Sequence, residues 1–188
     1  YLSVRTQSVM INCQQSKKLP VTHGVPQGAI LSPRIFTVYT ADMHTAVSSS
    51  LCSAYADDTG LLGHAKKEHI QALKTAMAED HSAISNWCSC NSLKLNREKT
   101  EYVAIHSPSL RNVPNLSLRL EGHDLTPLPY LRMLGVFYDK HMTFQDHTRL
   151  KSAKVTGFLR TLCSRRENFS RPCLKLLVDS YVNSSIPY

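Results

Sequence analysis

The sequence predicts an α+β fold built from short antiparallel strands and packed helices, followed by a smaller helical domain. Apolar residues recur at helical spacing over 66–88, which indicates a helix with one buried face. Period-two patterns on both sides of turn residues, at 51–63 and at 116–125, indicate β-hairpins. Strand-like patterns then stop, and two helical patterns follow. We therefore expect an α+β domain over residues 1–140 and a small helical domain over residues 141–188.

The first fifty residues are expected to contain a strand, an irregular loop and a helix. Apolar and β-branched residues over 4–13 favour a strand, and the polar residues 14–20 are typical of a turn. Two glycines and two prolines within 21–33 indicate an irregular loop. Pro33 suits the first turn of a helix, whose apolar residues continue at helical spacing until Ser48–Ser50 end it.

The turn of the hairpin expected over 51–63 carries two adjacent aspartates, Asp57 and Asp58, between apolar flanks. Adjacent like charges repel each other and are costly to desolvate. A divalent cation reverses that repulsion, and magnesium held by carboxylates normally works on phosphate groups. The alternative is a plain polar turn, because aspartate is common in turns. Taken alone, the pair favours the plain turn.

The second half of the chain is expected to continue with strands and then helices. Strands are expected at 101–106, at 116–125 with a turn at Gly122 and His123, and at 131–139. Helices are expected at 144–164 and 171–183, with Pro172 in the opening turn of the second.

Composition points towards a polyanionic partner. The chain of 188 residues has 22 Lys and Arg against 14 Asp and Glu, a net charge of +8, with a local concentration of basic residues over 151–171. No apolar run is long enough to span a membrane. The chain begins without Met and ends within an apolar pattern, so we expect it to be a piece of a longer polypeptide.

The six cysteines are expected to be free thiols and not zinc ligands. Only Cys88 and Cys90 are close in sequence, and no second metal-binding pair accompanies them. Free thiols fit a reducing compartment, so we expect a nuclear or cytoplasmic location.

Five ordered segments connect the carboxylate pair to a known family. They are GVPQGAILSP, YADDTGLL about thirty residues later, WCSCNSLKLNREKTEYVAIH, YLRMLGVFYDKHMTF and SYVNSSIPY. In order and spacing they resemble the reverse transcriptases of non-LTR, LINE-like retrotransposons, over essentially the whole chain. A lone YADD is a weak signal, whereas the five segments together are specific.

The resemblance implies a fold and an activity. Residues 1–140 would be a partial right-hand polymerase palm, lacking the upstream fingers and the first catalytic aspartate, and residues 141–188 a truncated, helical thumb. The full enzyme would be an RNA-directed DNA polymerase that extends a DNA primer on an RNA template. It would transfer nucleotides from dNTPs with two Mg²⁺ ions.

The resemblance also implies a role for each matching residue. Asp57 and Asp58 would ligate the magnesium ions, and Lys99 would lie near the triphosphate as a proton donor to pyrophosphate. Tyr55 would lie beside the primer terminus. Pro26, Gln27 and Gly28 would form the floor under the templating base and nucleotide; Leu134, Gly135 and Val136 the primer grip; and Lys151, Lys154, Arg160, Arg165 and Arg166 the contacts to the duplex backbone.

These segments also fit plainer interpretations when each is taken alone. The loop at 24–28 also fits a turn before a helix, Lys99 a solvated side chain, and residues 134–136 a strand of the core. For the whole chain, the alternatives are a non-catalytic relic or domesticated fragment that binds nucleic acid, and a structural α+β domain. Group II intron and telomerase-type polymerases share the nucleotidyl-transfer chemistry, but the ADDT motif and its short spacing to LKLN favour the LINE-like group.

One departure from the family concerns the third catalytic carboxylate, which the family carries on a strand upstream of GVPQG. The only acidic residue before Asp57 is Asp42, and we expect it on the helix that follows Pro33. The 188-residue chain by itself is therefore expected to be inactive.

Overall fold

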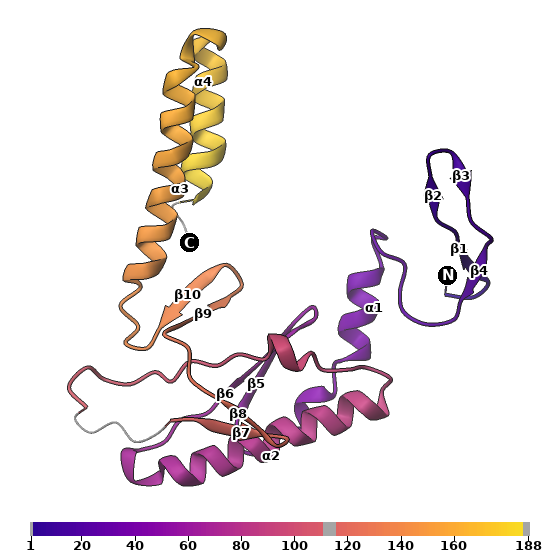
Figure 1. The fold of residues 1–188 in the computed structure, drawn as a ribbon, viewed down its shortest axis with the longest axis vertical. Coiled ribbons are helices and arrows are strands. Elements are labelled where there is room, and N and C mark those ends of the chain that lie inside the picture. The colour runs from indigo at the N-terminus through magenta and orange to yellow at the C-terminus, as the bar shows by residue number, and fades with distance from the viewer. Residues whose placement is uncertain (1, 111–115, 186–188) are drawn as a thin grey trace. The chain divides into compact units, whose positions relative to one another are not determined.

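The structure, a computed structural model, describes residues 2–110 and 116–185. It is α+β, as the sequence predicts, with small antiparallel sheets and helices (Figure 1). The fold divides into two compact units, Tyr1–Leu95 and Asn96–Tyr188. The expected boundary between palm and thumb, between residues 140 and 141, is not the boundary between these two units, and it stays a prediction.

The first unit opens with two short strand pairs that form one long hairpin. Strand β1 (Arg5–Gln7) pairs with β4 (Leu19–Val21), and β2 (Met10–Ile11) pairs with β3 (Gln14–Gln15). The expected strand over 4–13 is therefore interrupted, and the expectation of a turn over 14–20 is wrong. The reason is a two-residue turn at Asn12 and Cys13, where both φ values are positive (48° and 64°) and the chain folds back.

The helix that begins near Pro33 is shorter than expected. Helix α1 spans Ser32–Tyr39, and a separate 3₁₀ turn follows at Met43–Ala46. Asp42 lies at the start of this 3₁₀ turn, so its expected place on the helix is wrong. The β-branched run of Thr37, Val38 and Thr40 has low helix propensity, which accounts for the early end.

The hairpin and the long helix of the first unit confirm the sequence prediction. Strand β5 (Leu51–Tyr55) pairs with β6 (Asp58–Leu62), and helix α2 spans Ile70–Cys90. The buried core of this unit contains Met43, Ile84 and Cys88. Partly buried residues pack against it, among them Cys52 and Leu61 from the hairpin and Trp87, Leu93 and Leu95 from α2 and the residues after it.

The second unit contains two hairpins. Strand β7 (Leu118–Leu120) pairs with β8 (His123–Leu125), and its turn lies at Glu121 and Gly122, one residue earlier than expected. Strand β9 (Tyr130–Met133) pairs with β10 (Val136–Asp139). The single strand expected over 131–139 is thus a hairpin. Its turn is formed by Leu134 and Gly135, with φ values of 49° and 86°.

The strand expected over 101–106 is wrong. This segment has no regular secondary structure and lies in no sheet. Its backbone forms single hydrogen bonds with two different segments. The N–H of Leu128 donates to the carbonyl of Tyr102, and the N–H of His106 donates to the carbonyl of Lys140. Apolar composition alone therefore gave the wrong prediction here, since no neighbouring strand offers a continuous ladder.

Two helices end the chain, close to their expected positions. Helix α3 spans Gln145–Ser164, and α4 spans Arg171–Val178 and continues as a π-helix over Asp179–Asn183. The two helices lie side by side (Figure 1), and the rings of Phe158 and Tyr181 stack with centroids 4.1 Å apart. Residues 186–188 of the SYVNSSIPY segment lie outside the described residues.

Candidate catalytic hairpin and nucleic-acid surface

The carboxylate pair lies at the tip of the β5–β6 hairpin. Tyr55 pairs with Asp58, so Ala56 and Asp57 form a two-residue turn and Asp58 opens β6. The expected placement of the pair on a tight turn between antiparallel strands is confirmed. Both aspartates are exposed, and within the described parts of the chain neither accepts a hydrogen bond or forms an ion pair. Their oxygens are therefore open to an external cation.

The base of this hairpin is held by a buried carboxylate. Asp80 on α2 is only 2% exposed and accepts hydrogen bonds from the backbone N–H groups of Ser48 (2.9 Å), Ser49 (3.2 Å) and Ser50 (2.7 Å). These three residues lead directly into β5. Asp80 therefore fixes the direction in which the chain enters the carboxylate hairpin.

The same contacts decide the charge state of Asp80. Burial raises the pKa of this carboxyl, but hydrogen bonds from Ser48, Ser50 and Ser49 outweigh burial and leave the pKa below its usual value. Asp80 thus stays ionised at neutral pH.

Sequence reasoning missed Asp80, although a signal exists. Asp80 lies on the same helical stripe as Met77, Ile84 and Trp87, the apolar face of α2. A charged residue on an apolar stripe indicates a buried polar partner. The serines at 48–50 supply that partner, but their separation of about thirty residues hides the pairing in the sequence.

The loop expected to shape the nucleotide floor is held on both sides of Gln27. On one side, the guanidinium of Arg5 donates to the carbonyls of Gly24 (2.7 Å) and Leu2 (3.0 Å). On the other side, the buried hydroxyl of Ser32 donates to the carbonyl of Pro26 (2.6 Å). Gln27 itself is exposed. From the sequence we also expect this loop to face the two aspartates across an open groove, and this expectation stays a prediction.

Glycine is needed in this loop for a backbone reason. Gly28 has a φ of 76°, in the left-handed region, and a Cβ there would meet no atom within 4 Å. The space is open, so the constraint at Gly28 lies in the backbone conformation.

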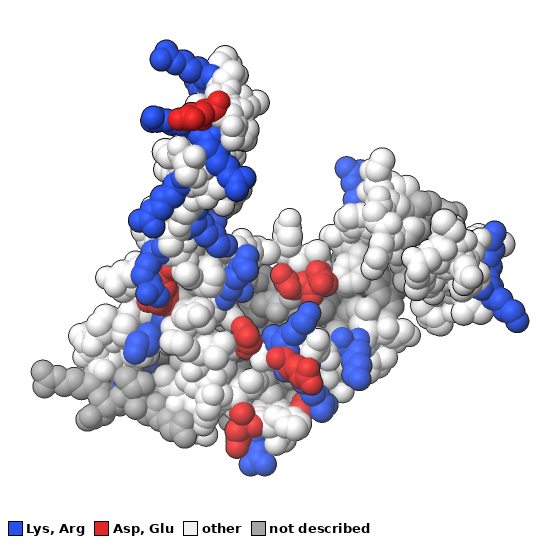
Figure 2. Space-filling view, turned by 45° about the horizontal axis from the view of Figure 1, so that its top comes forward, with Lys and Arg blue, Asp and Glu red and all other residues white. Residues whose placement is uncertain are grey.

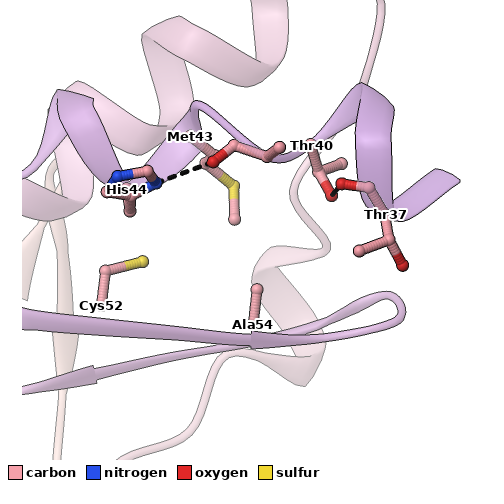
Figure 3. Close-up of a pocket in the computed structure, with 7 residues that line it drawn as sticks. Thr37, Thr40, Met43, His44, Cys52 and Ala54 are labelled. Atoms are coloured by element: carbon pink, nitrogen blue, oxygen red, sulfur yellow. Dashed lines mark hydrogen bonds between the residues drawn. The ribbon is translucent and has the colours of Figure 1, made fainter. Parts of the chain in front are cut away.

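A pocket of about 240 Å³ lies between α1, the 3₁₀ turn and β5 (Figure 3). Its lining includes His44 and, from β5, Cys52 and Ala54. The ring Nδ1 of His44 lies 2.7 Å from the carbonyl oxygen of Ala41. Burial, and to a smaller extent Asp80, raises the pKa of the Cys52 thiol, so this thiol stays protonated at neutral pH. None of the expected site residues lines this pocket.

The other expected site residues belong to the second unit. Lys99 is exposed on a 3₁₀ turn at Arg97–Lys99, which the Asn96 side chain caps by accepting from the N–H of Glu98 (3.2 Å). Leu134 is exposed, and Gly135 and Val136 are half-buried, at the tip of β9–β10.

Basic side chains follow the helical pair α3–α4. Figure 2 shows Lys and Arg at several heights of this pair, with few acidic side chains among them. Arg149 is paired with Asp146 (3.0 Å). The residues expected to contact a duplex are Lys151, which is half-buried, and Lys154, Arg160, Arg165 and Arg166, which are exposed.

A second buried carboxylate holds the start of α3. Asp139, 8% exposed, accepts from the N–H groups of His141 (2.9 Å), Thr143 (3.1 Å) and Phe144 (2.7 Å), and from the Thr143 hydroxyl (3.1 Å). Burial raises its pKa, but these hydrogen bonds prevail and lower the pKa to about 2. Asp139 therefore joins the β9–β10 hairpin to the basic helix.

The described residues contain neither a metal-binding cluster nor a membrane-spanning helix. No group of three or more His, Cys, Asp or Glu side chains in residues 2–110 and 116–185 is arranged to hold a metal ion. Among the same residues, no helix has the length and apolar character needed to cross a membrane.

Comparison with known proteins identifies the family. Residues 1–157 match the family described as reverse transcriptase (RNA-dependent DNA polymerase), which is most of the chain. The chain therefore belongs to the reverse transcriptase family.

Three of the relatives come from mobile elements of Drosophila melanogaster. The chain is 29% identical to the RNA-directed DNA polymerase from mobile element jockey, over 97% of this chain and 20% of that protein. It is 30% identical to a probable RNA-directed DNA polymerase from transposon BS, over 74% of this chain and 16% of that protein. The chain is 27% identical to a probable RNA-directed DNA polymerase from transposon X-element, over 88% of this chain and 18% of that protein.

The chain thus spans a fifth or less of the length of these relatives. No solved structure matches it significantly. The relatives support the resemblance to non-LTR retrotransposons that the five sequence segments indicate.

Proposed function

We propose that the chain is the palm and the beginning of the thumb of a retrotransposon RNA-directed DNA polymerase. The complete protein would extend a DNA primer on an RNA template, with dNTPs as substrates. The observation that carries this proposal is the exposed pair Asp57 and Asp58 on a tight hairpin, in a chain of the reverse transcriptase family.

The aspartates suit magnesium by their chemistry. Both present carboxylate oxygens without a protein partner in the described residues, and magnesium prefers such oxygens together with phosphate oxygens and water. Held by Asp57 and Asp58, magnesium would activate the primer 3′-hydroxyl and stabilise the leaving pyrophosphate. Two carboxylates are few for two ions, so we infer that a third comes from a part of the polypeptide upstream of this chain.

The remaining residues would orient the substrates. Pro26, Gln27 and Gly28 would support the templating base and the nucleotide, in a loop held by the contacts to Gly24 and Pro26. Tyr55, 67% exposed at the end of β5, would lie beside the primer terminus.

The second unit would act on the triphosphate, the primer and the duplex. Lys99 would protonate pyrophosphate as it leaves. The tip of β9–β10, at Leu134, Gly135 and Val136, would grip the primer strand. The basic residues on and after α3, namely Lys151, Lys154, Arg160, Arg165 and Arg166, would contact the phosphates of the duplex.

Primer extension by a longer polypeptide that includes this chain tests the proposal. Asp57→Asn should abolish incorporation on an RNA template, because it removes a charged metal ligand. Asp124→Asn is the control: it removes another exposed carboxylate, from the β7–β8 hairpin, and should leave extension near the wild-type rate. Nucleic-acid binding without any extension in the wild type would instead favour a non-catalytic relic.

The six cysteines are all free thiols. We propose a reducing, nuclear or cytoplasmic compartment for the polypeptide, which cell fractionation with a tagged protein would test.

A further inference from the structure

One arginine in the second unit is held in place without a carboxylate. Arg132 on β9 lies directly across from Phe137 on β10, and its guanidinium carbon lies 5.7 Å from the centroid of the Phe137 ring. Arg132 is exposed to solvent. This cation–π arrangement orders the guanidinium while its N–H groups remain open to water.

The ring beneath Arg132 is itself fixed. Tyr130 packs edge-on against Phe137 with ring centroids 5.7 Å apart, and His147 of α3 lies on it with centroids 6.1 Å apart. His147 also accepts a hydrogen bond from the backbone N–H of Phe137 (3.3 Å). The platform under Arg132 is therefore part of the junction between the hairpin and the basic helix.

No acidic side chain neutralises Arg132 within residues 2–110 and 116–185. The acidic residue on its own face of the hairpin is Asp139, and that carboxylate is buried and occupied by three backbone N–H groups. Three other arginines of the unit are paired with carboxylates: Arg97 with Glu121, Arg119 with Asp124, and Arg149 with Asp146. Arg132 thus differs from them in carrying a net charge that the described residues do not offset.

The position of Arg132 continues the basic surface of α3. His147, which packs under the hairpin, is followed by Lys151 and Lys154 four and seven residues later, on the same side of the helix. A cation on the hairpin and two cations on this helix side therefore belong to one packed body, joined through Phe137 and His147.

We propose that Arg132 is a phosphate-binding residue that connects the proposed nucleic-acid surface of α3 with the proposed primer-gripping tip of the β9–β10 hairpin. Its ligand is a backbone phosphate of the bound duplex, and it is preordered for that contact by the Phe137 ring. The inference rests on the proposed function, since it assumes that this unit binds nucleic acid.

The test is a salt series of duplex binding. A fluorescent DNA-primer–RNA-template duplex is titrated with the 188-residue chain between about 50 and 300 mM KCl, and log Kd is plotted against log salt concentration. Arg132→Ala should weaken binding about three- to tenfold and lower the slope by about 0.7 to 0.9, the value for one lost phosphate contact. Arg132→Gln should weaken binding and lower the slope by similar amounts while keeping most of the aliphatic side chain. It therefore tests the proposal even if the alanine variant folds poorly.

The matched control is Arg119→Ala. It removes the same charge from the neighbouring β7–β8 hairpin, where Arg119 lies 3.9 Å from Asp124, and should leave the slope unchanged. Arg132→Lys should keep the slope but bind more weakly than wild type, because lysine has no planar group to stack on Phe137.

Two outcomes would overturn the proposal, and they differ. If wild type binds with a steep salt dependence but the Arg132 and Arg119 variants behave alike, Arg132 has no phosphate contact and the proposed function stands. If wild type shows no salt-dependent duplex binding, the nucleic-acid role of the whole unit fails with it.

Discussion

At the scale of single residues, two buried carboxylates do the same structural work in the two units. Asp80 and Asp139 each accept hydrogen bonds from three backbone N–H groups at a point where the chain changes direction. Those N–H groups have no strand or helix partner, so without an acceptor they would be buried at a cost. Asp80 thereby orders the entry to the carboxylate hairpin, and Asp139 orders the start of the basic helix.

Replacing Asp80 by Asn should destabilise the first unit by about 2 to 4 kcal/mol, because the amide puts an NH₂ group among backbone N–H donors and leaves at least one donor unpaired. Urea unfolding of the chain at neutral pH measures this. Glu79→Gln, a neighbouring exposed position on α2, is the control and should change little. A loss below about 0.5 kcal/mol for Asp80→Asn, the usual range for surface changes, would contradict the role given to Asp80.

The lowered pKa values predict an acid limit to stability. Asp139, with a pKa of about 2 in the folded chain, and Asp80, with a lowered pKa, bind protons more readily when unfolded. The stability they contribute is therefore fully present above the unfolded pKa, near 3.8, and is lost as the pH falls towards 2. Urea unfolding between pH 7 and pH 2 should show this decline.

The control for the acid limit is Asp139→Asn. This variant should be less stable than wild type at neutral pH and should lose less further stability in acid. An unchanged acid profile would show that other carboxylates govern the decline.

At the scale of elements, sequence predicted most helices and two hairpins, β5–β6 and β7–β8, well, and the remaining strands less well. The β5–β6 hairpin has a polar turn between apolar strands, so its pattern is visible. The β9–β10 hairpin turns at Leu134 and Gly135 inside a largely apolar run, so its pattern is that of one strand. Strand pairing depends on a partner, which the sequence of a single segment does not contain; residues 101–106 show this, since they have strand composition and no ladder.

The residues of the candidate site also fall into two groups, those that the sequence reveals and those that only the fold reveals. Asp57, Asp58 and Gln27 could be singled out from local motifs. Asp80 and Arg132 could not, because the groups that define their environment are brought to them only by folding. These groups are the backbone of residues 48–50 for Asp80 and the Phe137 ring for Arg132.

The turn that presents the aspartates is strained at Ala56. Its φ is 53°, a left-handed conformation that costs an ordinary residue about 1 to 2 kcal/mol. Ala56→Gly should therefore stabilise the hairpin by up to about 1 kcal/mol, and the β-branched Ala56→Val should destabilise it by about 1 kcal/mol or more. Hydrogen exchange of the β5 and β6 amides is the measurement. Ala54→Gly, within β5, should have the opposite effect to Ala56→Gly, because glycine weakens a regular strand; equal effects at the two positions would refute the strain.

At the scale of the whole molecule, the proposed two-metal site would draw two of its carboxylates, Asp57 and Asp58, from this chain. Neither aspartate has a third acidic, histidine or cysteine neighbour arranged with it to hold a metal in the described residues. Magnesium requires near-octahedral oxygen coordination and gives up its waters reluctantly. Titration calorimetry of the 188-residue chain should therefore show weak magnesium binding or none. Tight, stoichiometric binding without nucleotide would mean that the ligand set is more complete than Asp57 and Asp58.

Binding and catalysis should separate in this chain. Its charge of +8 and the basic residues along α3 and α4 favour a duplex, and each phosphate contact releases counterions. Incorporation additionally needs the full set of metal ligands. We therefore expect the 188-residue chain to bind a primer–template duplex with strong salt dependence and to add no nucleotide. Replacing Arg165 and Arg166 by Ala should flatten the salt slope by about one unit per lost contact.

Asp57→Asn separates the two properties within one variant. It removes a negative charge close to the expected path of the duplex, so binding should be unchanged or slightly tighter. Primer extension with magnesium, run beside a filter-binding salt series on the same protein, measures both. If the 188-residue chain extends the primer and Asp57→Asn abolishes that extension, the third carboxylate comes from within this sequence. Asp42 would then be the first residue to replace, because it is the only acidic residue before Asp57.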